Sequence, residues 1–122
     1  PISNAWSGRS RVKQAKIERL RQENNLQVQE QVLFQTIQEL VQQYNALQVE
    51  RGQSDQNVAA QRIAFTIAQK RYEKGMINGI ELFTAKNLFA SAQNENLQVR
   101  LRSEINKNTL NFYNGLPVFA IK

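Results

Sequence analysis

Helix-breaking residues are almost absent from the interior of this chain. Its two prolines are Pro1 and Pro117, only Gly52 interrupts residues 10–72, and residues 80–114 contain neither glycine nor proline. Because proline in a helix interior costs about 3 kcal/mol and glycine about 1 kcal/mol, such uninterrupted stretches favour long helices. Neither stretch alternates with the period of a strand. We therefore predict an all-α chain built from two long helices.

Apolar residues in the first stretch follow a coiled-coil spacing. They recur at alternating steps of four and three residues, as in the seam between two helices, at Leu33, Ile37, Leu40, Tyr44 and Leu47. The second stretch carries one apolar run made of Leu82, Ala85, Phe89 and Ala92. A second run, slightly rotated around the helix, contains Leu97, Leu101, Ile105 and Phe112. Two amphipathic helices that share a core account for these runs.

A well-marked turn separates the two stretches. Gly75 can adopt the left-handed conformation that closes a helix. Asn78 is a strong N-cap, and Glu81, three residues later, can complete a capping box. The chain should therefore reverse here, which makes the two helices an antiparallel hairpin.

These signals also set the expected boundaries. We expect one domain with a linker at 1–9, a long helix at 10–73, a turn at 74–79, a second helix at 80–114 and a C-terminal extension at 115–122. Gly115 is expected to end the second helix. At about 1.5 Å per residue the two arms differ by roughly 40 Å, so the upper part of the first helix needs partner helices from a larger parent protein or an oligomer.

The position of the turn predicts the register of the hairpin. The expected neighbours across it are Ile63 with Phe89, Leu47 with Ile105 and Leu40 with Phe112. The alternative is a break at Gly52, with Ser54 or Asp55 as the N-cap of a separate helix. That break would give a three-helix bundle.

Composition excludes several classes of chemistry. The chain has no Cys and no His, so zinc fingers, thiol chemistry, iron–sulfur clusters and His-dependent triads are excluded, and we expect no cofactor and no metal. Gly75 and Gly79 belong to the turn and do not form a phosphate-binding loop. We expect no enzymatic activity.

Basic residues gather near the start of the first helix, at Arg9, Arg11, Lys13, Lys16, Arg19 and Arg21. Such a run is most often a solvated face, but it also suits nucleic acid or anionic lipid headgroups. Only Trp6 is nearby, so the aromatic interleaving of single-strand binders is missing and we expect no nucleic acid. A stand-alone basic coiled-coil adaptor, chaperone or nucleic-acid-binding module is the alternative to the interpretation that follows.

Three motifs resemble the TolC family of outer-membrane efflux proteins. One consists of Tyr72-Glu73-Lys74-Gly75 followed by Glu81-Leu82-Phe83-Thr84-Ala85, Phe89 and Ala92. The opening segment from Pro1 to Ala15 resembles the family's exit from a membrane strand into its long helix. The ending from Asn111 to Pro117 is similar to the family's helix end, in the form found in Bacteroides-type members.

The resemblance implies a wall segment of a passive export duct. Family members are trimers with a β-barrel in the outer membrane and a helical barrel in the periplasm, and they work with a periplasmic adaptor and an inner-membrane transporter. This chain would be the periplasmic part of the second repeat, with the membrane strands elsewhere in the parent protein. The fragment alone need not form the parent's trimer. Its 16 Gln and 13 Asn suit helices with two wet faces.

The resemblance also assigns a role to the turn. Because the turn motif matches that of the family, the resemblance places Tyr72, Gly75, Met76 and Ile77 at the end of the duct that docks the adaptor and gates the channel. The best-known member has an Arg where Ile77 stands. An ionic lock is therefore not expected, and closure would rest on apolar contact by Met76 and Ile77.

Overall fold

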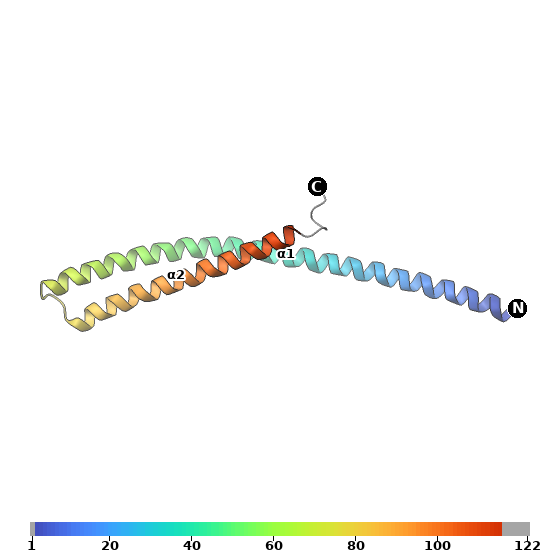
Figure 1. Cartoon of the computed structure of the whole chain (residues 1–122), viewed down its shortest axis with the longest axis horizontal. Helices are drawn as coiled ribbons and strands as arrows, with labels where there is room; N and C mark the ends of the chain where they lie inside the picture. Colours follow the sequence, from blue (N-terminus) through green and yellow to red (C-terminus); the bar gives the residue numbers. More distant parts are fainter. Residues whose placement is uncertain (1, 116–122) are drawn as a thin grey trace. The chain divides into compact units, whose positions relative to one another are not determined.

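The computed structural model describes residues 2–115, and within this range the chain is all-α, as predicted. Helix α1 spans Ile2–Glu73 and helix α2 spans Gly79–Asn114, and residues 2–115 contain no strand. The helices have 72 and 36 residues, so the arms of the hairpin are unequal. Figure 1 shows α2 returning beside the later part of α1. The C-terminal extension with Pro117 lies outside the described residues.

Helix α1 starts earlier than expected, α2 starts at Gly79 and not at Ile80, and the alternative break inside α1 is not observed. Helix α1 begins at Ile2 and not at Ser10, because residues 2–9 contain no proline and the single Gly8 costs only about 1 kcal/mol. It also continues without interruption through Gly52, so the three-helix alternative is wrong. Asp55 therefore lies inside α1 and does not cap a new helix.

The chain divides into two units, Pro1–Gln38 and Glu39–Lys122. In the first unit the described residues are the first part of α1, and almost all of its side chains are exposed. The second unit holds the rest of α1, the turn and α2. All contacts between α1 and α2 described below belong to this second unit.

The two helices of the second unit meet along a seam with coiled-coil spacing. On α2 the half-buried and buried positions recur at steps of three and four, at Leu82, Ala85, Phe89, Ala92, Asn96, Val99, Ser103 and Asn106. On α1 the matching positions are Leu40, Tyr44, Leu47, Arg51, Ser54, Val58, Gln61, Phe65 and Ala68. We call these two sets of residues the hairpin seam.

The hairpin seam is apolar near the turn and mixes apolar with polar residues farther from it. Val99 and Ala92 are its buried apolar residues, at 0% and 3% exposure, whereas the buried polar residues are Ser54, Ser103 and Asn106. Gln48 Nε2 donates to Ser103 Oγ at 3.1 Å, and Asn106 Nδ2 donates to Gln43 Oε1 at 3.4 Å. The seam thus holds two helices together without a large apolar core.

The predicted register is confirmed for Leu47 with Ile105 and differs in the partner of Phe89, whereas the pairing of Leu40 with Phe112 stays a prediction. Glu50 Oε1 lies 2.7 Å from Arg102 Nη2, and Leu47 lines the same groove as Ile105, the neighbour expected for it. Phe89, however, stacks on Phe65 and not on Ile63, which is exposed. The reason is that Phe65 lies on the seam, whereas Ile63 lies two residues earlier on another face of α1.

Candidate functional site: the turn and the outer face of the hairpin

A left-handed glycine closes α1 at the turn. Gly75 has φ +71°, which glycine adopts without the steric penalty of a Cβ. Its N–H donates to the Tyr72 carbonyl at 2.9 Å, and the Met76 N–H donates to the Arg71 carbonyl at 2.8 Å. This pair of bonds is the Schellman motif, which satisfies carbonyls that the end of a helix leaves without partners. The conformation predicted for Gly75 is therefore observed.

Asn78 caps the start of α2. Its backbone is extended, and its side-chain oxygen accepts a hydrogen bond from the Glu81 N–H at 2.8 Å. Glu81 also places a negative charge in the first turn, where the helix dipole favours it. At the other end of α2, Gly115 has φ −81° and donates its N–H to the Asn111 carbonyl at 3.0 Å, so Gly115 itself is not left-handed.

The turn presents apolar side chains to its surroundings. Met76 is 68% exposed and Tyr72 is 48% exposed, while Ile77 is half-buried. Two exposed residues that sequence reasoning missed follow immediately on α2, Ile80 and Phe83. Neither residue belongs to the apolar run that begins at Leu82. An apolar residue outside that run is expected to face away from the seam, and this could have identified both from the sequence. We call Tyr72, Met76, Ile80 and Phe83 the tip residues.

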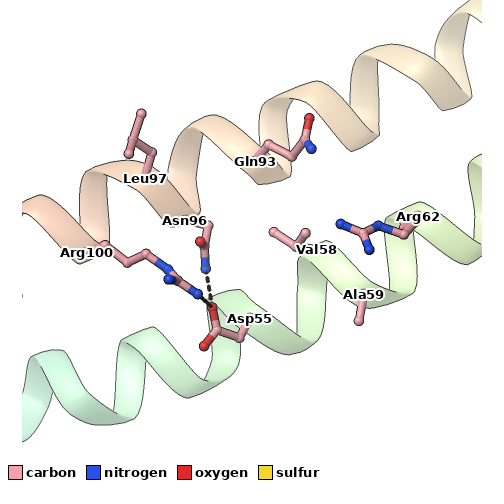
Figure 2. A pocket seen from close by; sticks show the side chains of 8 residues that line it. All are labelled: Asp55, Val58, Ala59, Arg62, Gln93, Asn96, Leu97 and Arg100. Atoms are coloured by element: carbon pink, nitrogen blue, oxygen red, sulfur yellow. Dashed lines mark hydrogen bonds and ion pairs between the residues drawn. The ribbon is translucent and has the colours of Figure 1, made fainter.

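A second apolar surface lies on the outer side of α2. The later run of this helix, Leu97, Leu101, Ile105 and Phe112, is between 54% and 67% exposed. This run is rotated around the helix relative to the run that begins at Leu82, and it therefore lies outside the seam. In this part of α2 the seam residues are Asn96, Val99 and Ser103. Figure 2 shows Leu97 pointing away from α1. The run is therefore not part of a core shared with α1, and we call it the outer stripe.

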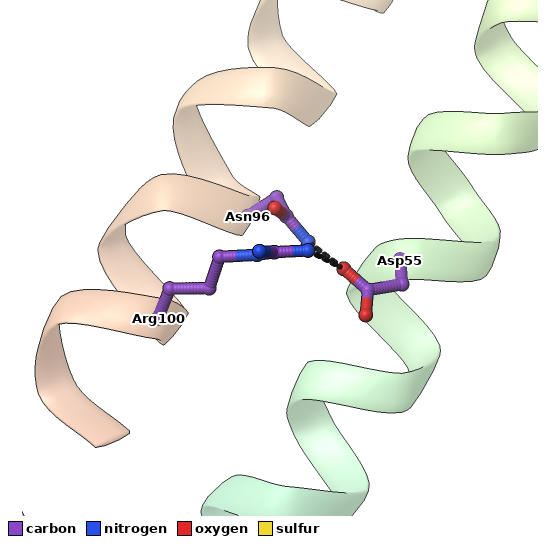
Figure 3. Close-up of polar contacts among 3 residues, drawn as sticks. All are labelled: Asp55, Asn96 and Arg100. Carbon is purple, nitrogen blue, oxygen red and sulfur yellow. Dashed lines mark hydrogen bonds and ion pairs between the residues drawn. The ribbon is translucent and has the colours of Figure 1, made fainter. Parts of the chain in front are cut away.

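A polar cluster joins the two helices beside the seam. Asn96 Nδ2 donates to Asp55 Oδ1 at 2.6 Å, and Arg100 Nη2 donates to the same oxygen at 2.9 Å (Figure 3). The pKa of Asp55 is lowered below its usual value, mostly by the Asn96 hydrogen bond and next by that of Arg100, because both stabilise the charged carboxylate. Because the carboxylate is already paired across the hairpin, its role is to fix the two helices in register.

The same cluster borders an open groove of about 550 Å³. It is lined by Asp55, Val58, Ala59, Arg62, Gln93, Asn96, Leu97 and Arg100 (Figure 2). Arg62 also approaches the seam, with its guanidinium carbon 5.8 Å from the centroid of the Phe89 ring. Asp55 is the only carboxylate of the groove, so the groove lacks the paired carboxylates of general acid–base catalysis.

Among residues 2–115, no three carboxylates come together in a way that could hold a metal ion. Neither α1 nor α2 contains an apolar stretch sufficient to cross a bilayer.

Comparison with known proteins gives one match. Residues 1–116 match a protein-family model described as outer membrane efflux protein. No curated protein and no solved structure matches the chain.

Proposed function

The chain belongs to the outer membrane efflux protein family, and from this premise we propose that α1 and α2 form part of the wall of a periplasmic tunnel. The family is a transport family, and the match extends over residues 1–116. In this proposal the parent protein is a trimer in the outer membrane, and the chain is the helical part of its second repeat. The tunnel is a passive path, whose substrates are delivered by an inner-membrane transporter through a periplasmic adaptor.

The exposed outer stripe is the observation that supports a wall position best. Leu101 and Ile105 are 54% and 65% exposed, although the seam beside them buries serine and asparagine. Covering each such side chain with a neighbouring helix contributes about 1 kcal/mol, since half or more of a side chain's apolar area is removed from water. A helix in a tunnel wall has a neighbour on each side, and the outer stripe supplies the second contact that α1 does not provide.

Substitution of the outer stripe tests the wall position. We expect Leu101→Gln/Ile105→Gln in the full-length protein to lose the trimer on native gels and to lose export in cells. The matched control is Glu104→Gln/Lys107→Gln, which changes two exposed polar residues on the same helix. Because Leu101 and Ile105 are 54% and 65% exposed in the isolated chain, its circular dichroism should stay unchanged in both variants. A normal trimer with normal export in the stripe variant would contradict the wall position.

The tip residues support a docking role for the turn. We assign Tyr72, Gly75, Met76 and Ile77 to the adaptor-docking and gating end, and Ile80 and Phe83 extend the same exposed apolar surface. An apolar surface of this kind suits contact with an adaptor helix, whose own apolar residues would cover it. With Ile77 at the position where the best-known member has an Arg, closure rests on packing and needs no ion pair.

Two substitutions of Gly75 separate docking from the shape of the turn. Both Gly75→Ala and Gly75→Arg place a side chain on a backbone with φ +71°, and a Cβ there meets no atom within 4 Å. They therefore share the backbone strain, and only Arg adds bulk and charge. We expect Gly75→Arg to abolish export and adaptor crosslinking at an unchanged level of trimer, while Gly75→Ala keeps crosslinking. Normal export and crosslinking in Gly75→Arg would exclude the docking role.

A further inference from the structure

The first turns of α1 form a face in which basic and apolar side chains are interleaved. Helix α1 begins at Ile2, so residues spaced four or three apart in these turns lie on the same side of the helix. One such side carries Ile2, Trp6, Arg9, Lys13, Lys16 and Leu20. The apolar members are well exposed, with Ile2 at 79%, Trp6 at 75% and Leu20 at 59%. We call these six residues the basic-aromatic face.

Neighbouring members of this face share surface hollows. Trp6 and Arg9 line one shallow hollow together with Ile2, and Arg9 and Lys13 line a second one together with Val12. The ring of Trp6 and the charges that follow it therefore belong to one continuous surface. A single ligand can contact both kinds of side chain at once.

Positive charge dominates this part of the helix. Residues 9–23 contain six basic side chains against Glu18 and Glu23, which leaves an excess of four positive charges. The two ion pairs among the described residues, Arg100 with Asp55 and Arg102 with Glu50, both lie in the second unit. The charges of the basic-aromatic face are thus not neutralised by either pair.

A neighbouring side of the same turns has a different chemistry. It carries small or uncharged polar residues with one acid, at Ser3, Ser7, Ser10, Gln14 and Glu18. Ser7 Oγ donates to the Asn4 carbonyl at 2.9 Å, so this hydroxyl is used within the helix. Other basic residues such as Arg11 lie away from the basic-aromatic face, so what distinguishes this face is that exposed apolar side chains and three basic ones occur on it together, where a planar partner can meet them.

We propose that the basic-aromatic face binds the surface of a bilayer that contains anionic phospholipid. Indole and aliphatic side chains favour the boundary between headgroups and acyl chains, and the long stems of Lys and Arg let their charges reach phosphates from the same depth. Anionic headgroups attract such a segment, and the attraction is additive over its basic residues. Nucleic acid fits less well, because Ile2 and Leu20 would meet no base and Trp6 alone cannot stack a strand. The proposal concerns residues 2–20 and goes beyond the tunnel role.

Trp6 makes the proposal directly measurable, because it is the only tryptophan in the chain. The 122-residue chain is mixed with vesicles of about three parts phosphatidylethanolamine to one part phosphatidylglycerol, or with vesicles of phosphatidylcholine alone. We expect a blue shift of tryptophan emission and cosedimentation with the anionic vesicles only. Raising the salt to about 0.5 M should reverse cosedimentation, since the charges are then screened. The absence of a shift with anionic vesicles overturns the proposal.

Two charge-matched variants test whether the face itself is responsible. Arg9→Gln/Lys13→Gln removes two charges from the basic-aromatic face, and Arg11→Gln/Arg21→Gln removes two from other sides of the same turns. Gln preserves helix propensity, and circular dichroism checks that helix content is retained. We expect vesicle affinity to fall about tenfold or more in the first variant and by less than about threefold in the second. If both variants lost the same vesicle affinity, binding would depend only on net charge, and the assignment of the basic-aromatic face would be overturned. Tighter binding of a single-stranded oligonucleotide than of vesicles would overturn the choice of lipid.

Discussion

Phe65 of α1 and Phe89 of α2 stack across the hairpin, with ring centroids 6.0 Å apart and planes inclined by 19°. The Arg62 guanidinium lies near the Phe89 ring as well. This aromatic contact lies between the turn and the polar cluster at Asp55. It is a contact between large apolar side chains in a seam that also buries Ser54, Ser103 and Asn106.

Removing one ring should destabilise the hairpin. We expect Phe89→Ala to lower the free energy of unfolding by about 2 kcal/mol, less than for a fully buried ring because Phe89 is only half-buried. The measurement is thermal or urea unfolding of the isolated chain followed by circular dichroism. Phe83→Ala is the control, since Phe83 is 62% exposed and should change stability by no more than about 0.5 kcal/mol. Equal effects of the two substitutions would mean that the stack contributes nothing beyond helix propensity.

Two glycines should respond to alanine in opposite directions. A Cβ at Gly52 or at Gly75 meets no atom within 4 Å, so steric contact does not distinguish them. Gly52 lies inside α1, where alanine should stabilise the helix by about 1 kcal/mol. Gly75 has φ +71°, where alanine should cost about 1 kcal/mol. The unfolding midpoints of the two variants should fall on opposite sides of the wild-type value, and a shift in the same direction would contradict this assignment.

Acid should weaken the contact at Asp55. Its pKa is lowered in the folded chain, first by the Asn96 hydrogen bond and then by Arg100. The stability that this carboxylate contributes is therefore present above its unfolded pKa of about 3.9 and is lost as the pH falls through the lower folded pKa. We expect the unfolding midpoint to drop as the pH falls below about 4, and to drop less in Asp55→Asn.

A second carboxylate provides the control for this experiment. Glu104 is exposed and belongs to neither ion pair between the helices. Glu104→Gln should therefore keep the wild-type dependence on pH. If Asp55→Asn and wild type lost stability in parallel across the acid range, the Asp55 contact would have no measurable effect.

The first unit should drive assembly of the isolated chain. Leu26 and Phe34 are 58% and 59% exposed on α1. Since apolar surface of this kind associates when concentrated, light scattering at about millimolar concentration should detect species larger than the 14.1-kDa monomer. Leu26→Gln/Phe34→Gln should shift the population toward the monomer. A wild-type chain that remains monomeric at this concentration would refute the expectation.

Local signals in the sequence were sufficient for the helices and the turn. The absence of proline from the chain interior and the scarcity of glycine there predict two long helices. Gly75 closes α1 and Asn78 caps α2 through hydrogen bonds to residues only a few positions away. The register also followed, because the position of the turn leaves few ways to align two antiparallel helices. The helices, the Gly75 closure and the Asn78 cap depend on interactions between near neighbours in the chain, and such interactions can be read from the order of the residues.

Only the tertiary structure decided which apolar run faces the partner helix. Leu82 to Ala92 and Leu97 to Phe112 are both apolar stripes of a helix, and the spacing of each is compatible with a seam. The structure places the first run in the seam and turns the second outward, where Asn96, Ser103 and Asn106 face α1 in its place. Likewise, nothing near Asp55 in the chain predicts its bonds to Asn96 and Arg100. Sequence period defines the faces of one helix, but which face is covered depends on a partner many residues away, and that choice is made only when the two helices pack.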